Sequence, residues 1–459
     1  MKKLFNILIF LLPVLACAQQ NWYKSSPLNC IWMNVGSEGF SSNKIEYISL
    51  AFDSSGQPYV AFKDYVTYLK ATVMKFDGNS WVNVGNAGFS NGEIYFTSFA
   101  FSPSGQPYVA YSANGDAWKA TVMTFNGANW VSVGTAGFST GEADFTSLAF
   151  SPSGEPYLAF EDFGKSNKAT VMKFDGNSWV NVGNAGFSAG QAWYTSLAFS
   201  LSGEPYVVFS DYANSRKATV MKFDGTNWAS VGFIGFSTGR ADNTCLAFSL
   251  TGDPYVAFID YGHSYKATVM KFNGTSWVNV GNAGFSAGLS AFISLAFNPS
   301  DSLPYVGYMD YGYSQKATVM KFNGTSWVNV GNAGFSIGNA GYTSLAFSPS
   351  GQPYVAYEDG GNASKATVMK YDFPTGFNEP QNSQLSIYPN PATNIITIET
   401  LGATGESNLV FVNIEGQQLI TRQITEPKTQ IDISCLPTGV YIVKLTSTKS
   451  VATTKLIKQ

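Results

Sequence analysis

Short apolar runs separated by turn residues cover most of the chain. The segment from residue 97 to 134 shows the pattern, with runs at 97–101, 107–111, 119–125 and 130–134. These runs are rich in β-branched and aromatic residues, and Gly, Pro, Asn and Asp lie between them. Runs of this length and composition predict β-strands, and no helical period follows the first twenty residues. Each repeat therefore contains four antiparallel strands, here called a, b, c and d.

The four-strand unit recurs with a step of 49 residues, which becomes 50 once. A tryptophan opens strand d in each copy, at Trp32, Trp81, Trp130, Trp179, Trp228, Trp277 and Trp327. Periods of about 40 to 50 residues are typical of propeller blades or helical arrays. Pro or Gly every few residues excludes helix pairs. The sequence therefore predicts an all-β protein whose residues 19–373 form a seven-bladed β-propeller.

The ends of the repeat region complement each other. The seventh copy stops at Asp372 without a Trp strand, whereas the chain begins with a lone Trp strand around Trp32. We therefore expect the N-terminal strand to pair with strand c of the last copy and to close its blade. Closure would remove the exposed sheet edges that promote aggregation.

Two residue types that repeat with the strands are expected to support the fold. The tryptophans should fill the wedges between the outer parts of adjacent blades. An Asp ends strand b in most copies and a Lys opens every strand c, as at Asp162 and Lys168. A ring of acids could suggest calcium, but we expect each Asp to pair with the Lys across its hairpin.

The N-terminal segment of the chain predicts export from the cytoplasm. Residues 1–18 hold two lysines, an apolar run and Ala16-Cys17-Ala18, which predicts a secretory signal peptide cut after Ala18. Cys17 also fits a lipoprotein box loosely, which leaves lipidation open. The formal net charge is −3 and no basic stripe exists, so nucleic acid is not expected as a partner. No later apolar run is long enough to span a bilayer.

A second module follows a polar linker at residues 374–384. Residues 385–459 alternate apolar and polar positions between Pro and Gly turns, which predicts a small β-sandwich of about seven strands. This module resembles the type A C-terminal sorting domain of the bacterial type IX secretion system, found in Bacteroidetes. The resemblance lies in Tyr388, Pro389, Asn390, Pro391, Gly416, Leu436, Pro437, Gly439 and Tyr441. It implies handling by the type IX machinery and a secreted or outer-membrane surface location.

The repeats themselves are similar in layout to kelch and WD-repeat propellers. They lack the kelch Gly-Gly pair and the Trp-Asp strand ending, so no functional residues carry over from those families. No Ser-His-Asp set, metal-spaced His/Cys cluster or phosphate-binding Gly loop is evident, so no cofactor, no metal and no enzymatic activity are expected.

Differences between the copies point to one face. The a–b and c–d turns hardly change, whereas the b–c loops and the segments that lead into strand a vary freely, and these two variable connections emerge on the same side of a four-stranded blade. Aromatic residues mixed with polar ones are typical of recognition surfaces. The candidate ligand-binding residues on this face are Tyr95, Phe96, Trp118, Phe145, Trp193, Tyr194, Arg240, Asp242 and Tyr342.

The sequence thus predicts a secreted or cell-surface binding protein whose ligand is a glycan or a surface protein. Two alternatives stay open. Glu142, Asp144, Glu161 and Asp242 could serve a glycoside hydrolase that uses paired carboxylates. The ring could also be a structural spacer without a specific ligand, and the candidate rings could simply pack over the blade ends.

Overall fold

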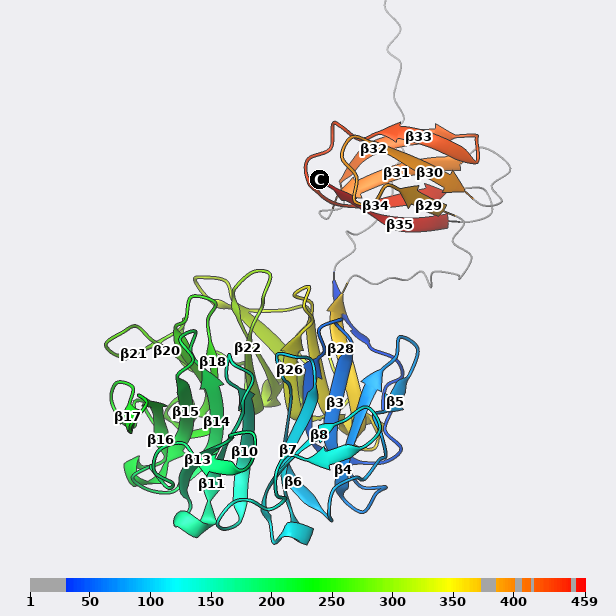
Figure 1. Cartoon of the computed structure of the whole chain (residues 1–459). Helices are drawn as coiled ribbons and strands as arrows, with labels where there is room; N and C mark the ends of the chain where they lie inside the picture. The colour runs from blue at the N-terminus through cyan, green and yellow to red at the C-terminus, as the bar shows by residue number, and fades with distance from the viewer. Residues whose placement is uncertain (1–29, 373–384, 401–406, 414–416, 447–450) are drawn as a thin grey trace, which may run out of the picture. The chain divides into compact units, whose positions relative to one another are not determined.

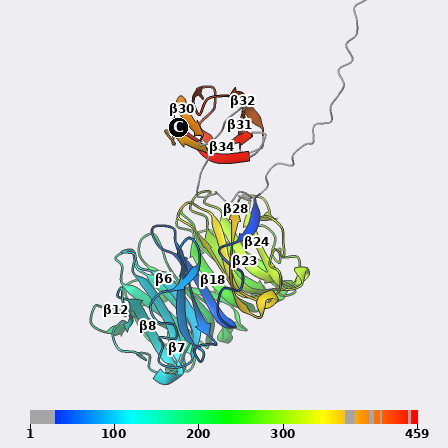
Figure 2. The same ribbon diagram turned by 90° about the vertical axis from the view of Figure 1, so that its right-hand side faces the viewer.

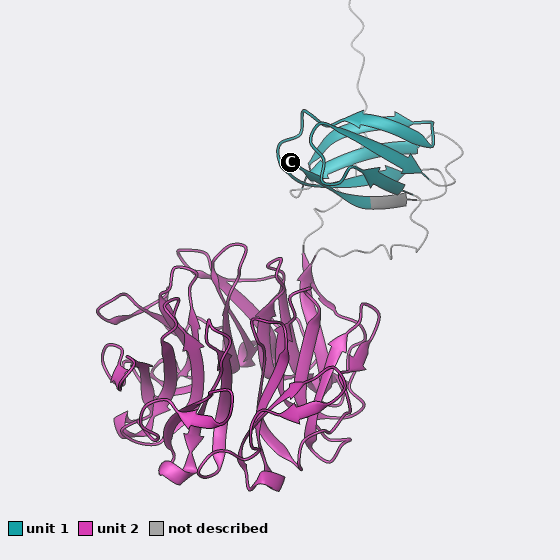
Figure 3. Cartoon of the chain, viewed as in Figure 1, with its two compact units in different colours: residues 1–29, 373–459 teal, residues 30–372 magenta. Residues whose placement is uncertain are grey.

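The computed structural model describes residues 30–372, 385–400, 407–413, 417–446 and 451–459. The predicted signal peptide at 1–18 with Cys17, the linker at 374–384 and Gly416 lie outside these residues. One compact unit spans Cys30–Asp372 (Figure 3), and the strands from Leu385 onward belong to another. Within the described ranges, no helix has the length and apolarity required to cross a bilayer.

The larger unit consists of seven four-stranded antiparallel sheets arranged around an axis (Figures 1 and 2). Blade 1 contains β2 (Ile45–Phe52), β3 (Pro58–Asp64), β4 (Lys70–Phe76) and β5 (Trp81–Asn83). Blade 2 contains β6 (Ile94–Phe101), β7 (Pro107–Ala113), β8 (Lys119–Phe125) and β9 (Trp130–Ser132). Blade 3 contains β10 (Ala143–Phe150), β11 (Pro156–Asp162), β12 (Lys168–Phe174) and β13 (Trp179–Asn181).

The remaining blades repeat this order. Blade 4 contains β14 (Ala192–Phe199), β15 (Pro205–Asp211), β16 (Lys217–Phe223) and β17 (Trp228–Ser230). Blade 5 contains β18 (Ala241–Phe248), β19 (Pro254–Asp260), β20 (Lys266–Phe272) and β21 (Trp277–Asn279). Blade 6 contains β22 (Ser290–Phe297), β23 (Pro304–Asp310), β24 (Lys316–Phe322) and β25 (Trp327–Asn329). Blade 7 contains β26 (Ala340–Phe347), β27 (Pro353–Asp359), β28 (Lys365–Asp372) and β1 (Ile31–Asn34).

Short 3₁₀ helices occupy the b–c loops of blades 2 to 7: η1 (Asn114–Asp116), η2 (Phe163–Lys165), η3 (Tyr212–Asn214), η4 (Tyr261–His263), η5 (Tyr311–Tyr313) and η6 (Gly360–Asn362). These loops and the segments that lead into strand a form the variable face. The a–b and c–d turns form the opposite, uniform face.

The predicted closure of the ring is confirmed. β1 pairs antiparallel with β28, and Ile31 stands opposite Asp372. The chain therefore enters and leaves the propeller at the uniform face. The seven-bladed fold follows directly from this pairing, because β1 supplies the fourth strand of blade 7.

The inner strands are joined around the axis by side-chain to backbone hydrogen bonds. Each strand a contacts strand a of both neighbours. A Ser Oγ of one blade accepts from the backbone N–H of the next, as in Leu148 N–H to Ser98 Oγ at 3.0 Å. Cys245 replaces this serine in blade 5 and its Sγ accepts from Leu295 N–H at 3.4 Å. Cys245 thus takes the structural place of that serine.

The tryptophans join the outer parts of the blades, as predicted. Trp179 in blade 3 is 8% exposed, stacks on Phe138 with a centroid distance of 4.2 Å, and donates Nε1–H to the carbonyl of Val133 at 2.7 Å. Val133 follows strand d of blade 2, so the indole bridges two blades. The other bridges run from Trp32 to Val330, Trp81 to Val35, Trp130 to Val84, Trp228 to Val182, Trp277 to Val231 and Trp327 to Val280.

The expected Asp–Lys pairs are wrong. Asp162 stands opposite Lys168 in the ladder, but its carboxylate accepts from Gly164 N–H at 3.0 Å and from the Thr170 hydroxyl at 3.1 Å. The carboxylate is buried at the start of a 3₁₀ turn, where backbone N–H groups lack partners, so it caps that turn. In blade 2, which lacks the Asp, Asp116 from the turn accepts from Thr121 instead.

The C-terminal strands form two packed sheets, as the β-sandwich prediction requires. One sheet has the order β29 (Leu385–Tyr388), β30 (Ile395–Thr400), β33 (Lys428–Asp432). The other has the order β32 (Gln418–Ile424), β31 (Ser407–Asn413), β34 (Gly439–Thr446), β35 (Val451–Lys458). Buried side chains from both sheets, including Ile398 and Phe411, form a single core.

We expect Trp179→Ala to destabilise the propeller by about 3 to 5 kcal/mol, because it leaves a cavity between two blades and an unpaired carbonyl. Equilibrium urea unfolding of the full-length chain measures this loss. Phe233→Ala is the matched control, since Phe233 is 79% exposed and its truncation should cost under about 0.5 kcal/mol. A loss below about 1 kcal/mol for Trp179→Ala would show that the bridges carry little of the stability.

Candidate functional site

The nine predicted ligand-binding residues all lie on the variable face, but they do not form one site. Phe96, Phe145, Tyr194 and Tyr342 surround the axis. Tyr95 and Trp118 lie together on blade 2, Trp193 lies on blade 4, and Arg240 pairs with Asp242 on blade 5.

The axial residues form a ring of aromatic side chains. Equivalent positions of the seven blades hold Tyr47, Phe96, Phe145, Tyr194, Asn243, Phe292 and Tyr342. Neighbouring rings contact each other, as in Phe145 and Tyr194 with centroids 4.6 Å apart. All seven residues have φ between 49° and 57°, at a bulge where the register of strand a shifts. This left-handed conformation is unfavourable for aromatic residues, so the contacts between neighbouring blades must hold it in place.

The blade 2 aromatics are held by a lysine that the sequence prediction missed. Lys63 of blade 1 lies with Nζ 3.8 Å from the centroid of Tyr95, and the Tyr95 and Trp118 centroids are 5.1 Å apart. Lys63 is 2% exposed and forms ion pairs with Glu93 at 2.8 Å and with Glu46 at 3.6 Å. Two carboxylates and an aromatic ring thus satisfy this buried cation within the chain.

Blades 4 and 5 bring the other candidates together. The Cζ of Arg216 lies 4.1 Å from the Trp193 ring centroid and 5.2 Å from that of Tyr212. Arg240 Nε donates to Asp242 at 2.7 Å, and Asp242 also accepts from the Tyr261 hydroxyl at 2.9 Å. We call Trp193, Tyr194, Tyr212, Arg216, Arg240, Asp242 and Tyr261 the blade 4–5 cluster.

Electrostatics links the two halves of this cluster. Burial raises the pKa of Tyr194, nearby Asp242 raises it further, and Arg240 and Arg216 oppose the rise. Tyr194 therefore lies between the charged groups of blade 4 and those of blade 5. Burial and the hydrogen bond to Asp242 raise the pKa of Tyr261 to about 12, so its hydroxyl stays a hydrogen-bond donor at neutral pH.

Exposure distinguishes residues that a ligand can reach from those that only pack. Accessible aromatic residues lie in the b–c loops, with Tyr68 86%, Tyr212 51% and Tyr311 45% exposed, whereas the nine predicted residues are half-buried or buried. Arg216 was not among the predicted residues, although its position in the repeat and the rarity of arginine distinguish it. It precedes the Lys that opens strand c, where blade 2 has Trp118, and only one other arginine, Arg240, lies between residues 19 and 373.

A pair of carboxylates lies beside the cluster on blade 3. Asp144 and Glu161 face each other across strands a and b. Glu161 is 2% exposed, and its Oε1 has no hydrogen-bond partner among the residues that the structure describes. Burial raises the pKa of Glu161 to about 7, although contacts with Asn167 and Trp193 lower it. Burial, and then Glu142, raises the pKa of Asp144 to about 6. Blade 1 has Glu46 and Lys63 at these two positions.

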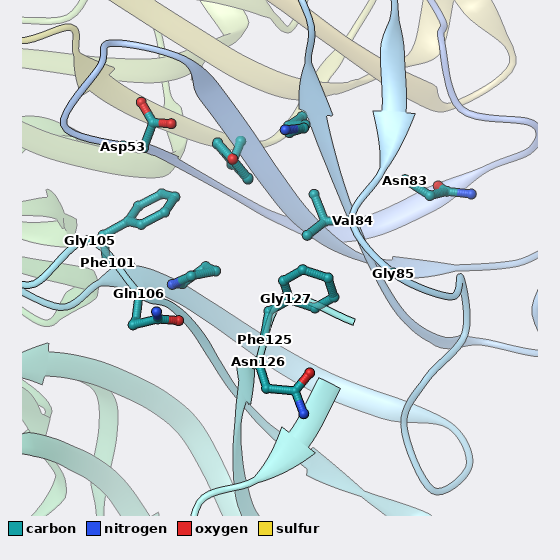
Figure 4. Close-up of a pocket in the computed structure, with 13 residues that line it drawn as sticks. Asp53, Asn83, Val84, Gly85, Phe101, Gly105, Gln106, Phe125, Asn126 and Gly127 are labelled. Carbon is teal, nitrogen blue, oxygen red and sulfur yellow. The ribbon is translucent and has the colours of Figure 1, made fainter. Parts of the chain in front are cut away.

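Two cavities lie at the uniform face. One, of about 680 Å³, is at the axis and is lined by apolar residues of strand a, such as Leu50, Phe101 and Phe297. The other, of about 440 Å³, lies between blades 1 and 2 and is shown in Figure 4. None of the nine predicted residues lines either cavity.

The residues behind the C-terminal resemblance hold the strands of that module. The Asn390 side chain donates to the carbonyl of Lys455 at 2.6 Å and accepts from Ile457 N–H at 2.8 Å, which fixes it to β35. The Tyr441 hydroxyl donates to the carbonyl of Pro437 at 2.6 Å, and Leu436 is buried. Tyr388 is 39% exposed and donates to Glu399 at 3.1 Å.

Comparison with protein families identifies this module. The family described as secretion system C-terminal sorting domain matches residues 386–459. The C-terminal module is a type IX sorting domain. Its presence places the protein outside the cell, either secreted or at the outer-membrane surface, and implies handling by the type IX secretion system. A search of curated proteins finds no match.

Solved structures similar to the chain share low sequence identity with it. PorZ, an essential surface component of the type IX secretion system of Porphyromonas gingivalis, has a TM-score of 0.47 and 13% identity over 91% of this chain, which spans 60% of that protein. The SapL1 lectin in complex with alpha methyl fucoside has a TM-score of 0.44 and 14% identity, covering 66% of this chain and 99% of its own. A Penicillium chrysogenum alpha-L-arabinanase complexed with arabinobiose has a TM-score of 0.44 and 11% identity, covering 76% and 99%.

The carboxylate pair on blade 3 predicts a pH dependence of stability. A carboxyl group whose pKa is raised by folding stabilises the folded state at low pH, and this contribution is lost as pH rises through the raised pKa. The melting temperature of the wild type, relative to Glu161→Gln, should therefore fall between about pH 5 and pH 8. Thermal unfolding followed by circular dichroism across this range measures the difference.

Glu204→Gln serves as the control for this experiment. Lys222 lowers the pKa of Glu204 through an ion pair, so this group adds no pH dependence between about pH 5 and pH 8. The melting temperature of Glu204→Gln should therefore vary with pH over this range as that of the wild type does. Parallel pH profiles for the wild type and Glu161→Gln would contradict the raised pKa of Glu161.

Proposed function

We propose that the variable face of the propeller binds a glycan outside the cell, with the blade 4–5 cluster as its centre. The observation that carries this proposal is the combination of accessible aromatic rings with fixed planar polar groups. Tyr212 of the cluster is 51% exposed, and Tyr265, whose ring centroid lies 4.3 Å from that of Tyr261, is 47% exposed, so both offer ring area. The paired Arg240 and Asp242 offer fixed donors and acceptors. Pyranose rings present apolar C–H faces and hydroxyl edges, which such a surface complements.

The scaffold supports this reading in two ways. The segments that carry the cluster are anchored by ladder and cap hydrogen bonds, such as Asp211 to Ala213 N–H at 3.1 Å, so they are rigid before a ligand arrives. Both ends of the described propeller chain, at Ile31 and Asp372, lie at the face opposite the variable loops. A surface protein as the ligand is the other outcome of the binding test.

We expect Tyr212→Ala to weaken glycan binding by roughly tenfold, since exposed aromatics at the centre of a site contribute more than about 1 kcal/mol. Glycan-array screening followed by titration of the best ligand with the full-length chain measures this effect. Tyr311→Ala is the matched control, because Tyr311 begins the equivalent loop of blade 6 and is 45% exposed, but Ala291 and Gln315 there replace Trp193 and Arg216. Equal affinities for the two variants would place the ligand elsewhere.

A glycoside hydrolase is the second candidate function, and the Asp144–Glu161 pair favours it. Two carboxylates with raised pKa values can hold one proton between them at neutral pH, as an acid and a base require. If this holds, chromogenic glycosides should be turned over by the wild type, and Asp144→Asn should lower the rate at least a hundredfold. Turnover that survives Asp144→Asn, or its absence in the wild type, would reject this candidate.

A further inference from the structure

Arg216 is a cation that the protein does not neutralise. Its guanidinium lies over Trp193 and Tyr212, with centroid distances of 4.1 and 5.2 Å. Among the residues that the structure describes, no ion pair or hydrogen bond engages this guanidinium. The acid nearest in sequence, Asp211, is buried and already accepts from Ala213 N–H, Asn214 Nδ2 and Thr219 Oγ1.

The second arginine of the cluster shows the contrast. Arg240 forms a bidentate pair with Asp242, and its Cζ lies 4.5 Å from the Tyr261 ring centroid. Its charge is therefore neutralised within the protein, and its Nε and Nη2 already donate to Asp242. Arg216 has the same aromatic support without a carboxylate. The two neighbouring blades thus present one neutral pair and one available cation.

The backbone of Arg216 is firmly held. Its φ is 58°, in the left-handed region, and its N–H donates to the carbonyl of Asp211 at 2.8 Å. Its own carbonyl accepts from Ala241 N–H at 2.8 Å and from the Ser210 hydroxyl at 3.0 Å. The guanidinium therefore starts from a fixed point, and less conformational entropy is lost when a ligand binds.

Only one blade carries a charge at this position. The equivalent residues of the other blades are Leu69, Trp118, Asn167, Tyr265, Gln315 and Ser364. General attraction of polyanions is also opposed by the formal net charge of −3. A guanidinium that is planar, carries five donors and is weakly hydrated suits a carboxylate or sulfate group.

We propose that Arg216 binds the anionic groups of an acidic polysaccharide, whose sugar rings pack against Tyr212 and Trp193. This inference rests on the proposed glycan-binding function and narrows its ligand class. The anionic group is a uronate carboxylate or a sulfate ester, since both present paired oxygens to the two parallel N–H donors of a guanidinium.

Paired probes test the proposal with the full-length chain. Polygalacturonate is compared with its methyl-esterified form, and dextran sulfate with dextran, so that each pair differs only in its charged group. We expect the acidic member of at least one pair to bind ten times or more tighter than its neutral partner, and the pair that responds identifies the group. Arg216→Gln should abolish this preference, so that the acidic member binds this variant no more tightly than its neutral partner does.

Two further variants test whether binding of the acidic probe requires the planar guanidinium of Arg216 or only a positive charge. Arg216→Lys keeps the charge but loses the planar pair of donors, so it should bind the acidic probe at least threefold more weakly than the wild type. Lys165→Gln removes an exposed charge from the equivalent loop of blade 3 and should bind as the wild type does. Binding of the acidic probe by Arg216→Gln at wild-type affinity would overturn the proposal.

The outcomes distinguish this inference from the function on which it rests. If Tyr212→Ala weakens binding but acidic and neutral probes bind equally well, the site binds glycans and the role of Arg216 is wrong. If the wild type binds none of the probes and no glycan on the array, the proposed function fails, and the inference fails with it.

Discussion

The fold depends on the bridge that each tryptophan makes to the preceding blade. A four-stranded sheet this small cannot bury both of its faces alone, so each blade is stable only against two neighbours. The indole ring fills the outer wedge while its N–H pairs with a carbonyl that would otherwise be buried without a partner. Serine to backbone bonds serve the same purpose at the axis. The ring is complete only because Trp32, on the first strand, reaches Val330 of blade 6.

This constraint also determines where the sequence is free to vary. Positions that bridge blades, such as Trp179 or Ser98, meet the same neighbours in every repeat and so hardly change, with Cys245 the one replacement of the serine. The second residue of strand a and the residue before strand c have fixed backbones, yet their side chains project from the variable face. The second residue of strand a, at Glu46, Asp144 and Trp193, shows how one backbone site accepts an acid or an aromatic ring.

The architecture could be predicted from the sequence because the copies of the repeat can be compared with one another. The number of tryptophans equivalent to Trp32, and of prolines that open strand b, gives the number of blades. The missing strand after Asp372 indicates how the ring closes. Side-chain partners could not be predicted in this way. Asp162 stands opposite Lys168 in the ladder, as expected, but the unpaired N–H groups of the adjacent 3₁₀ turn and the Thr170 hydroxyl are better placed than the lysine.

The candidate site was predictable only to the level of a face. Comparison of the repeats shows which positions vary, and Trp193, Tyr194, Arg240 and Asp242 do converge. Side-chain contacts decide the rest, because Arg216 becomes part of the site through the rings of Trp193 and Tyr212 on its own blade. The repeat pattern of the sequence does not show which of these side chains come into contact.

Differences between blades also bear on the number of ligands that the ring can hold. Identical loops would offer seven equal sites, whereas here each blade presents a different set of groups. Blade 1 neutralises Lys63 with two acids, blade 3 places Glu161 at the same position, and blade 6 has Met309 there. The free guanidinium with two aromatic supports occurs on blade 4 alone among the described residues. Under the proposed glycan-binding function, one such cluster on a sevenfold scaffold predicts one ligand chain across the variable face and not seven equal sites.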